Sequence, residues 1–236
     1  MKIIPLSEGS FTIDKTKLFV PFDEGTDDLQ KRPTGSLLVE VQPFIVITSE
    51  DILLLDTGLG FEKDGVMQLH RNMTDAGINP GEITKVLLSH LHKDHAGGVG
   101  ASFPNAKFYI QKKELEFAFE KGFPSFVTEE LEVLKHSPQV ELLDGNGVLD
   151  GYIKYEVTRA HSPYHQVFTI VDGGEKLFFG ADDAPQLHQM LHKFVAKYDH
   201  NGRLAMELRQ QWKQQGEQEG WTFLFYHDIK TPVHKF

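Results

Sequence analysis

Residues 85–98 read KVLLSHLHKDHAGG and join a short apolar stretch to three histidines and an aspartate. His90 and His92 follow a predicted strand two residues apart, so their side chains can point the same way, because side chains alternate along an extended chain. Asp94 and His95 come next, before a pair of glycines. Imidazole and carboxylate groups both suit divalent cations such as zinc. This stretch therefore predicts a metal site at the end of a strand.

The composition restricts the kinds of site that the chain can build. None of the 236 residues is cysteine, which excludes disulfides, thiolate zinc sites and a cysteine nucleophile. The formal net charge of −10 argues against nucleic acid as a partner. No segment approaches the roughly 20 apolar residues of a membrane span, and the start of the chain lacks the apolar run of a signal peptide. We expect a cytoplasmic protein that acts on a small molecule without a membrane.

The hydrophobic pattern predicts short strands with helices between them in both halves of the chain. Strands are expected within residues 36–48, 52–55, 85–89, 107–110, 140–171, 176–179 and 222–226. Helices are expected at residues 66–76, 112–120, 128–135, 187–198 and 203–214. The pattern alone indicates one domain that contains both helices and strands.

The run from His90 to His95 resembles the HxHxDH signature of the metallo-β-lactamase fold superfamily. The segment His161-Ser162-Pro163-Tyr164-His165 is similar to the GHTPGH-like segment of that family, with Ala160 and Tyr164 where glycines are common. The resemblance covers essentially the whole chain. It implies an α+β fold, a four-layer αββα sandwich. Residues 1–236 would form a single hydrolase domain with a helical insertion near 111–136.

The resemblance also implies two divalent metal ions, with zinc expected and manganese or iron suited to the same ligands. Asp182 would bridge the ions, and its neighbour Asp183 is the competing candidate, which the alignment of the preceding strand disfavours. The implied ligands of the first ion are His90, His92 and His161, and those of the second are Asp94, His95 and His227.

Further residues are candidates for supporting roles. Asp56 resembles the family's aspartate that orients a ligand histidine or its loop, although aspartate is also common in ordinary turns. His165 is a candidate for the same orienting role. His188 and His192 are spaced four apart on a predicted helix, and a solvated helix face explains them better than a metal site.

The implied chemistry is that of a metal-dependent hydrolase with a binuclear site. A metal-bridging hydroxide would attack an ester, a lactone or a related carbonyl or phosphoryl centre. Asp94 and Asp182 would be the catalytic carboxylates, because they can orient the hydroxide and carry its proton.

Two branches of the family remain as hypotheses for the substrate class. The chain looks nearest to the N-acyl homoserine lactonases and methyl parathion hydrolase. In the lactonases a tyrosine commonly lies three residues after the bridging aspartate. Here Pro185 stands in that place, so Tyr164 is the candidate for the substrate pocket.

The alternative enzymatic reading is a glyoxalase II-like thioesterase, which normally adds a C-terminal helical domain beyond the last histidine; this sequence ends at Phe236. A third reading is a non-catalytic metal-binding or sensing protein. The apolar stretch 117–126 is a candidate for a homodimer contact or a substrate lid.

Overall fold

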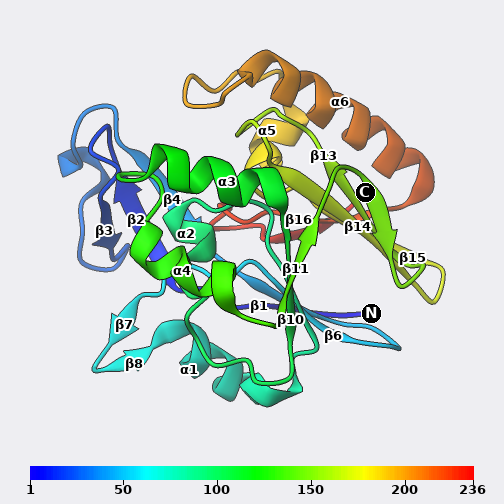
Figure 1. Ribbon diagram of the computed structural model, residues 1–236. Helices are drawn as coiled ribbons and strands as arrows, with labels where there is room; N and C mark the ends of the chain where they lie inside the picture. Colours follow the sequence, from blue (N-terminus) through cyan, green and yellow to red (C-terminus); the bar gives the residue numbers. More distant parts are fainter.

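Two mixed sheets of six strands each form the centre of the molecule, which the computed structural model describes over residues 1–236 (Figure 1). In spatial order, the first sheet contains β1 (Lys2–Pro5), β5 (Phe44–Ile47), β6 (Ile52–Leu55), β9 (Lys85–Leu87), β10 (Lys107–Gln111) and β11 (Val140–Leu143). The second contains β12 (Gly147–Leu149), β13 (Ile153–Val157), β14 (Gln166–Asp172), β15 (Glu175–Phe179), β16 (Thr222–Leu224) and β17 (Val233–Lys235). Neighbours from β6 to β11 are parallel, as are β15 and β16.

The strands are apolar on both faces because both faces of each sheet are covered. In β6, Leu53 and Leu55 belong to the core between the sheets, whereas Leu54 belongs to the core outside the first sheet. In β15, Phe179 faces the other sheet and Phe178 faces outward. Since side chains alternate along a strand, a continuous apolar run supplies two cores at once.

Helices cover the outer face of each sheet and complete four layers (Figure 1). The first sheet is covered by α1 (Gln68–Asp75), α3 (Lys112–Lys121) and α4 (Thr128–His136), which share a core cluster with it. The second is covered by α5 (Leu187–Leu191) and α6 (Gly202–Glu219), where Trp212 packs on Phe178 with ring centroids 4.7 Å apart. The predicted αββα sandwich is confirmed.

Smaller elements stand beside the sandwich. A three-stranded sheet has the order β3 (Phe19–Phe22), β2 (Gly9–Ile13) and β4 (Leu37–Val41), and β7 (Glu62–Lys63) pairs with β8 (Val66–Met67). The short helix α2 (Lys93–Ala96) follows β9, and 3₁₀ turns occupy Leu29–Lys31, Pro80–Glu82 and Ala181–Asp183. The predicted helical segment 111–136 provides α3 and α4, which connect the parallel strands β10 and β11.

One predicted helix is shorter than expected. The pattern predicts a helix over 187–198, whereas α5 ends at Leu191. The fully buried Arg209 donates to the carbonyl oxygens of Phe194 at 2.6 Å and Asp183 at 2.8 Å. Phe194 lies within the predicted helix, so Arg209 satisfies a carbonyl oxygen that the longer helix would use, and the chain is irregular after α5.

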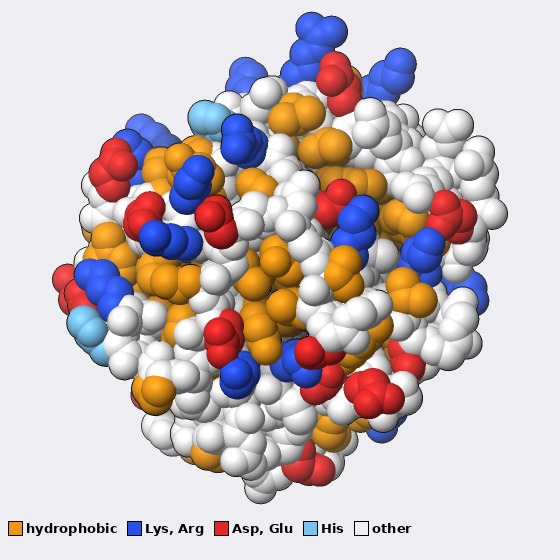
Figure 2. Space-filling view, turned by 45° about the vertical axis from the view of Figure 1, so that its right-hand side comes forward, with side chains coloured by type: hydrophobic (Ala, Val, Ile, Leu, Met, Phe, Trp, Pro, Cys, Tyr) orange, Lys and Arg blue, Asp and Glu red, His pale blue; other side chains and the backbone are white.

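The face drawn in Figure 2 carries hydrophobic side chains near its middle, with acidic and basic side chains interspersed around them. No helix combines the length and the apolar character needed to cross a lipid bilayer.

Candidate metal centre

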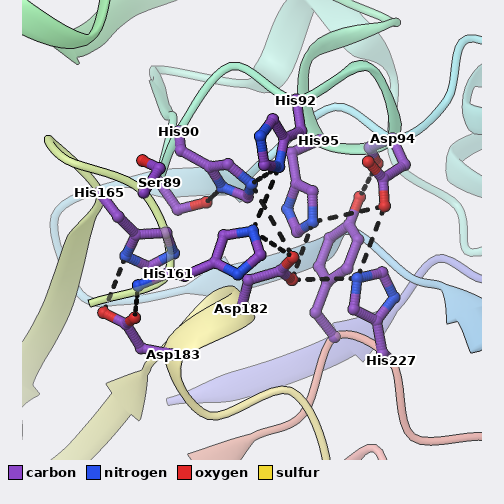
Figure 3. Close-up of polar contacts among 12 residues, drawn as sticks. Ser89, His90, His92, Asp94, His95, His161, His165, Asp182, Asp183 and His227 are labelled. Carbon is purple, nitrogen blue, oxygen red and sulfur yellow. Dashed lines mark hydrogen bonds and ion pairs between the residues drawn. The ribbon is translucent and has the colours of Figure 1, made fainter. Parts of the chain in front are cut away.

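The predicted site residues lie in loops at one edge of the two sheets. His90 follows β9, Asp182 follows β15 and His227 lies three residues beyond β16, while His161 lies in the connection from β13 to β14. Because β15 and β16 are parallel, their carboxyl ends meet at the same edge. Strands from both sheets therefore bring their polar ends together (Figure 3).

A first group of donors contains His90, His92, His161 and Asp182, whose ligand atoms lie within 4.8 Å of one another. Nδ1 of His92 lies 2.9 Å from Nε2 of His90 and 3.2 Å from Nε2 of His161. The Oδ2 oxygen of Asp182 lies 3.1 Å from Nε2 of His161. Three imidazole nitrogens and one carboxylate oxygen thus converge on one point, which is a common donor set for a tetrahedral metal ion.

A second group adjoins the first and contains Asp94, His95 and His227. Oδ2 of Asp94 lies 3.7 Å from Nε2 of His95 and 3.5 Å from Nε2 of His227. The Oδ1 oxygen of Asp182 lies 3.0 Å from each of these two nitrogens. One oxygen of Asp182 therefore faces each group. Asp183 lies behind the site, where its carboxylate accepts the backbone N–H of His161 at 2.7 Å.

The protonation of these groups follows from burial and close charges. Burial, followed by the neighbouring histidines, holds the pKa of His90 and His92 well below the ordinary value, so both rings are neutral and can bind a cation. Burial raises the pKa of Asp182, but the charges of His95, His227 and His161 outweigh it and hold that pKa well below its usual range. The same attraction raises the pKa of His95 well above its usual range despite burial.

Unpaired atoms at the centre fit a cation. Nε2 of His95 and Oδ1 of Asp182 are buried and lie 3.0 Å apart, but neither atom makes a hydrogen bond of acceptable geometry. Buried polar atoms are nearly always paired, because leaving one unpaired costs about 1–3 kcal/mol. A positive ion between the two would satisfy both. The nitrogen and oxygen donors, without sulfur, fit a divalent metal of the zinc, manganese or iron type.

Hydrogen bonds to Nδ1 of His95 and His161 turn Nε2 of both rings toward the centre. Nδ1 of His95 lies 2.8 Å from Oδ2 of Asp56, and the same oxygen accepts the hydroxyl of Ser89 at 2.7 Å, while Oδ1 of Asp56 accepts the backbone N–H of Ser89 at 2.7 Å. Nδ1 of His161 lies 2.8 Å from Oδ1 of Asp199. Such partners fix the ring orientation and tautomer of a metal ligand. Asp56 contacts the outer side of the His95 ring, and its orienting role stays a prediction.

The remaining histidines lie outside the donor groups. The His165 ring lies behind His90, with centroids 4.8 Å apart, and its Nδ1 lies 3.0 Å from Oδ2 of Asp183. This position suits the predicted supporting role. His188 and His192 contact each other through their rings, 4.6 Å between centroids, and belong to neither group.

Three buried residues at the site were not among the predicted site residues. Asp199 is one of them. Glu114 of α3 accepts the backbone N–H of Leu91 at 3.1 Å and the hydroxyl of Ser162 at 3.2 Å, so it ties together the two loops that carry ligand histidines. Tyr226 stacks on the His95 ring with centroids 4.1 Å apart and donates to the carbonyl oxygen of Asp94. Its place next to His227 is the only sequence signal for this set.

The glycine pair after the histidine run allows a close approach of two loops. A Cβ atom on Gly97 would lie 2.3 Å from the carbonyl oxygen of Leu59, and one on Gly98 would lie 2.2 Å from that of Thr57. The backbone N–H of Thr57 donates to the carbonyl oxygen of His95 at 2.7 Å. The glycines are therefore required by packing against the loop after β6.

A cavity of about 610 Å³ opens on both donor groups. Its apolar lining comes from the three-stranded sheet and from residues 194–196. Tyr164 does not line this cavity, because its ring packs against Phe117 with centroids 5.9 Å apart. The role of Tyr164 in a substrate pocket therefore stays a prediction, and this cavity does not include it. Tyr198 lines the cavity instead, and its ring centroid lies 6.1 Å from that of His161.

Two adjoining His/Asp donor groups at the edge of an αββα sandwich define a divalent-metal protein. The chain belongs to the metallo-beta-lactamase superfamily, whose sequence model matches residues 39–227. The predicted family and fold are thereby confirmed.

Three known proteins illustrate the likeness. The N-acyl homoserine lactonase AttM of Agrobacterium fabrum is 31% identical over 107 residues, an alignment that spans 40% of this chain and 38% of the relative. The N-acyl homoserine lactonase of Bacillus cereus is 25% identical over 244 residues, 92% of this chain and 94% of the relative. The solved structure of AidC, a dizinc quorum-quenching lactonase with bound product, has a TM-score of 0.74 at 22% identity, covering 99% of this chain and 89% of AidC. These likenesses support the predicted metal-dependent hydrolase.

Proposed function

We propose that the protein hydrolyses a lactone or a related ester at a binuclear metal site. The observation that carries this proposal is the carboxylate of Asp182, which turns one oxygen toward each of two donor groups. The proposed ions are zinc. The proposed ligands are His90, His92 and His161 for one ion, Asp94, His95 and His227 for the other, and Asp182 for both.

When bound, the two ions supply a nucleophile at neutral pH and polarise the carbonyl oxygen that it attacks. The carboxylates of Asp94 and Asp182 line the cavity, where they can orient the attacking group and accept its proton. No protein nucleophile is required. The apolar walls of the cavity exclude water around the reacting groups, which strengthens electrostatic interactions there.

Tyr198 is the proposed donor to the substrate oxygen. It lines the cavity beside His161. It comes from a later part of the chain than Pro185, the place where the lactonases commonly have a tyrosine. Burial, with the carboxylates of Asp182 and Asp199 acting in the same direction, raises the pKa of Tyr198 to about 12 against a hydrogen bond from Gln189. The phenol therefore keeps its proton and can donate a hydrogen bond to a developing oxyanion.

Two observations favour a lactone with an acyl chain as the substrate class. AttM and the Bacillus cereus relative are N-acyl homoserine lactonases. The cavity is lined by Ile13, Phe19, Leu37 and Val39 on one side and by Phe194 and Val195 on the other. Such walls suit an aliphatic chain.

We also propose that residues 1–236 act as one domain with a helical insertion at α3 and α4. Support comes from the core between the sheets, which contains Leu55 of the first sheet and Phe168 of the second in one cluster.

The test is a substrate panel on protein reconstituted with zinc. The panel contains an acyl homoserine lactone, an aryl ester, a thioester and a phosphotriester, and we expect the lactone to have the highest kcat/KM. Asp182→Ala should abolish turnover and reduce bound metal, whereas Asp144→Ala, at an exposed position, should leave both unchanged. Full activity of Asp182→Ala would contradict the proposal. Turnover of the thioester alone would show that the substrate is a thioester and not a lactone.

A further inference from the structure

Lysines gather around the mouth of the cavity although the chain as a whole is acidic. Lys15, Lys17, Lys93 and Lys197 all line the cavity, while the formal net charge of the chain is −10. None of the four lies within 4.0 Å of a carboxylate oxygen, whereas lysines elsewhere, such as Lys107, pair with a glutamate. A cluster of unpaired cations in an acidic protein points to a ligand that brings its own negative charge.

Lys93 is the member of this cluster nearest to the donor groups in sequence, between His92 and Asp94. Its ammonium lies 5.7 Å from the ring centroid of Phe19 and 5.8 Å from that of Phe123. The side chain is half-buried between aromatic surfaces. Water therefore solvates this ammonium incompletely, and no carboxylate replaces the lost water.

Lys17 lies close to Lys93. Both lysines line the same cavity, and Lys17 is two residues from Phe19, whose ring centroid lies 5.7 Å from the Lys93 ammonium. Two ammonium groups in a partly apolar cavity repel each other unless an anion lies between them.

The acidic side chains of the cavity do not form ion pairs with Lys17 and Lys93. Asp94 and Asp182 face the donor groups. Asp14 is held in its own turn, where its Oδ1 accepts the backbone N–H of Thr16 at 2.8 Å and the hydroxyl of Thr16 at 2.5 Å. Neither Lys17 nor Lys93 therefore forms an ion pair with the acidic side chains that line the cavity, although Asp94 is the next residue after Lys93.

We propose that the substrate carries a negatively charged oxyacid group in addition to the bond that is hydrolysed, and that Lys17 and Lys93 bind that group. The inference rests on the proposed hydrolysis for the reaction and narrows its substrate class from neutral acyl lactones to anionic ones. The apolar walls of the cavity suit the aliphatic part of such a substrate. Ammonium groups act as point charges toward such anions and do not require a planar partner.

The kinetic test uses two lactones that differ in one group. N-adipoyl homoserine lactone ends in a carboxylate, and its terminal carboxamide is the neutral match. We expect the zinc-loaded protein to favour the carboxylate by about tenfold or more in kcat/KM, as one or two charge-assisted contacts provide. The ratio should fall to about one in the Lys17→Met/Lys93→Met double variant, a loss of about tenfold. It should persist in Lys17→Arg/Lys93→Arg.

Lys113→Met is the matched control, since it removes the same charge at an exposed position of α3 outside the cavity. This variant should keep the ratio of the unmodified protein. High salt should reduce the ratio, because screening weakens the contact of partly exposed charges. A ratio of one in the unmodified protein, or an unchanged ratio in the double methionine variant, would overturn the inference.

A binding measurement separates this inference from the proposed reaction. Hexanedioate and its monoamide are not hydrolysed, and each offers one carboxylate to the metal ions, so calorimetry with the zinc-loaded protein reports the second carboxylate alone. Tighter binding of hexanedioate that is lost in the double methionine variant supports the inference, even if no lactone is turned over. Equal affinities for the two compounds contradict it, even if neutral lactones are hydrolysed.

Discussion

Asp199 offers a test of how the structure orients His161 toward the first proposed metal ion. Its Oδ1 lies 2.8 Å from Nδ1 of His161, and this is the only hydrogen bond on the outer side of that ring. The Asp199→Ala change removes the partner and frees the ring to rotate and to change tautomer. It leaves all seven proposed ligands in place.

The expected effect follows from the role of such partners. Losing the hydrogen bond to a ligand histidine typically weakens metal binding by about 10–100-fold, or about 1.4–2.7 kcal/mol. Asp199→Asn should give a smaller loss, because its amide oxygen can still accept from Nδ1 without the full charge.

The assay is competition for zinc with a chromophoric chelator, with Asp144→Ala as the control for removal of an exposed carboxylate. Urea unfolding of the metal-free proteins distinguishes a local effect on zinc affinity from a loss of the fold. Zinc affinity that is unchanged in a folded Asp199→Ala protein would refute the argument that this hydrogen bond prepares His161.

Three further predictions concern the fold and its titration. Gly98→Ala should lower the free energy of unfolding by about 1–3 kcal/mol in chemical denaturation, because its methyl group would lie 2.2 Å from a carbonyl oxygen; unchanged stability would refute the packing argument. Glu114→Ala should lower kcat/KM by about tenfold or more while Glu116→Ala does not, because only Glu114 joins the two ligand loops; equal effects would contradict this. The metal-free protein should be less stable at pH 8.5 than at pH 6.5. Burial raises the pKa of Glu8 to about 8, and Asp182 raises that of His161 despite burial, so the folded state holds protons that it loses as pH rises through this window. Urea midpoints at the two pH values test it, and a higher midpoint at pH 8.5 would contradict it.

The fold could be predicted from the sequence because its strongest signals are local. The apolar run at 52–55 and the strand at 85–87 are short enough to be strands and too short for buried helices. The residues from His90 to His95 lie close together by chain geometry alone, so their pattern identifies a metal site before any tertiary contact is known. The distant proposed ligands His161 and His227 were predicted only through resemblance to a family.

What could not be predicted depends on contacts between distant segments. Tyr198 lies in a stretch whose apolar spacing favours a helix, and only the buried hydrogen bonds of Arg209 to Phe194 and Asp183 explain why the helix ends early. Tyr164 is three residues from the proposed ligand His161 in sequence, yet its ring packs against Phe117. Local sequence carries no signal for either outcome.

We propose that two metal ions act together, with one oxygen of Asp182 toward each ion. The most direct measurement is a titration of metal-free protein with Mn²⁺, followed by electron paramagnetic resonance and by lactone turnover in the same samples. The account predicts a spin-coupled pair signal that grows together with turnover up to two equivalents of metal, and the loss of both in Asp182→Ala. Full turnover at one equivalent, with only the signal of isolated Mn²⁺, would contradict it.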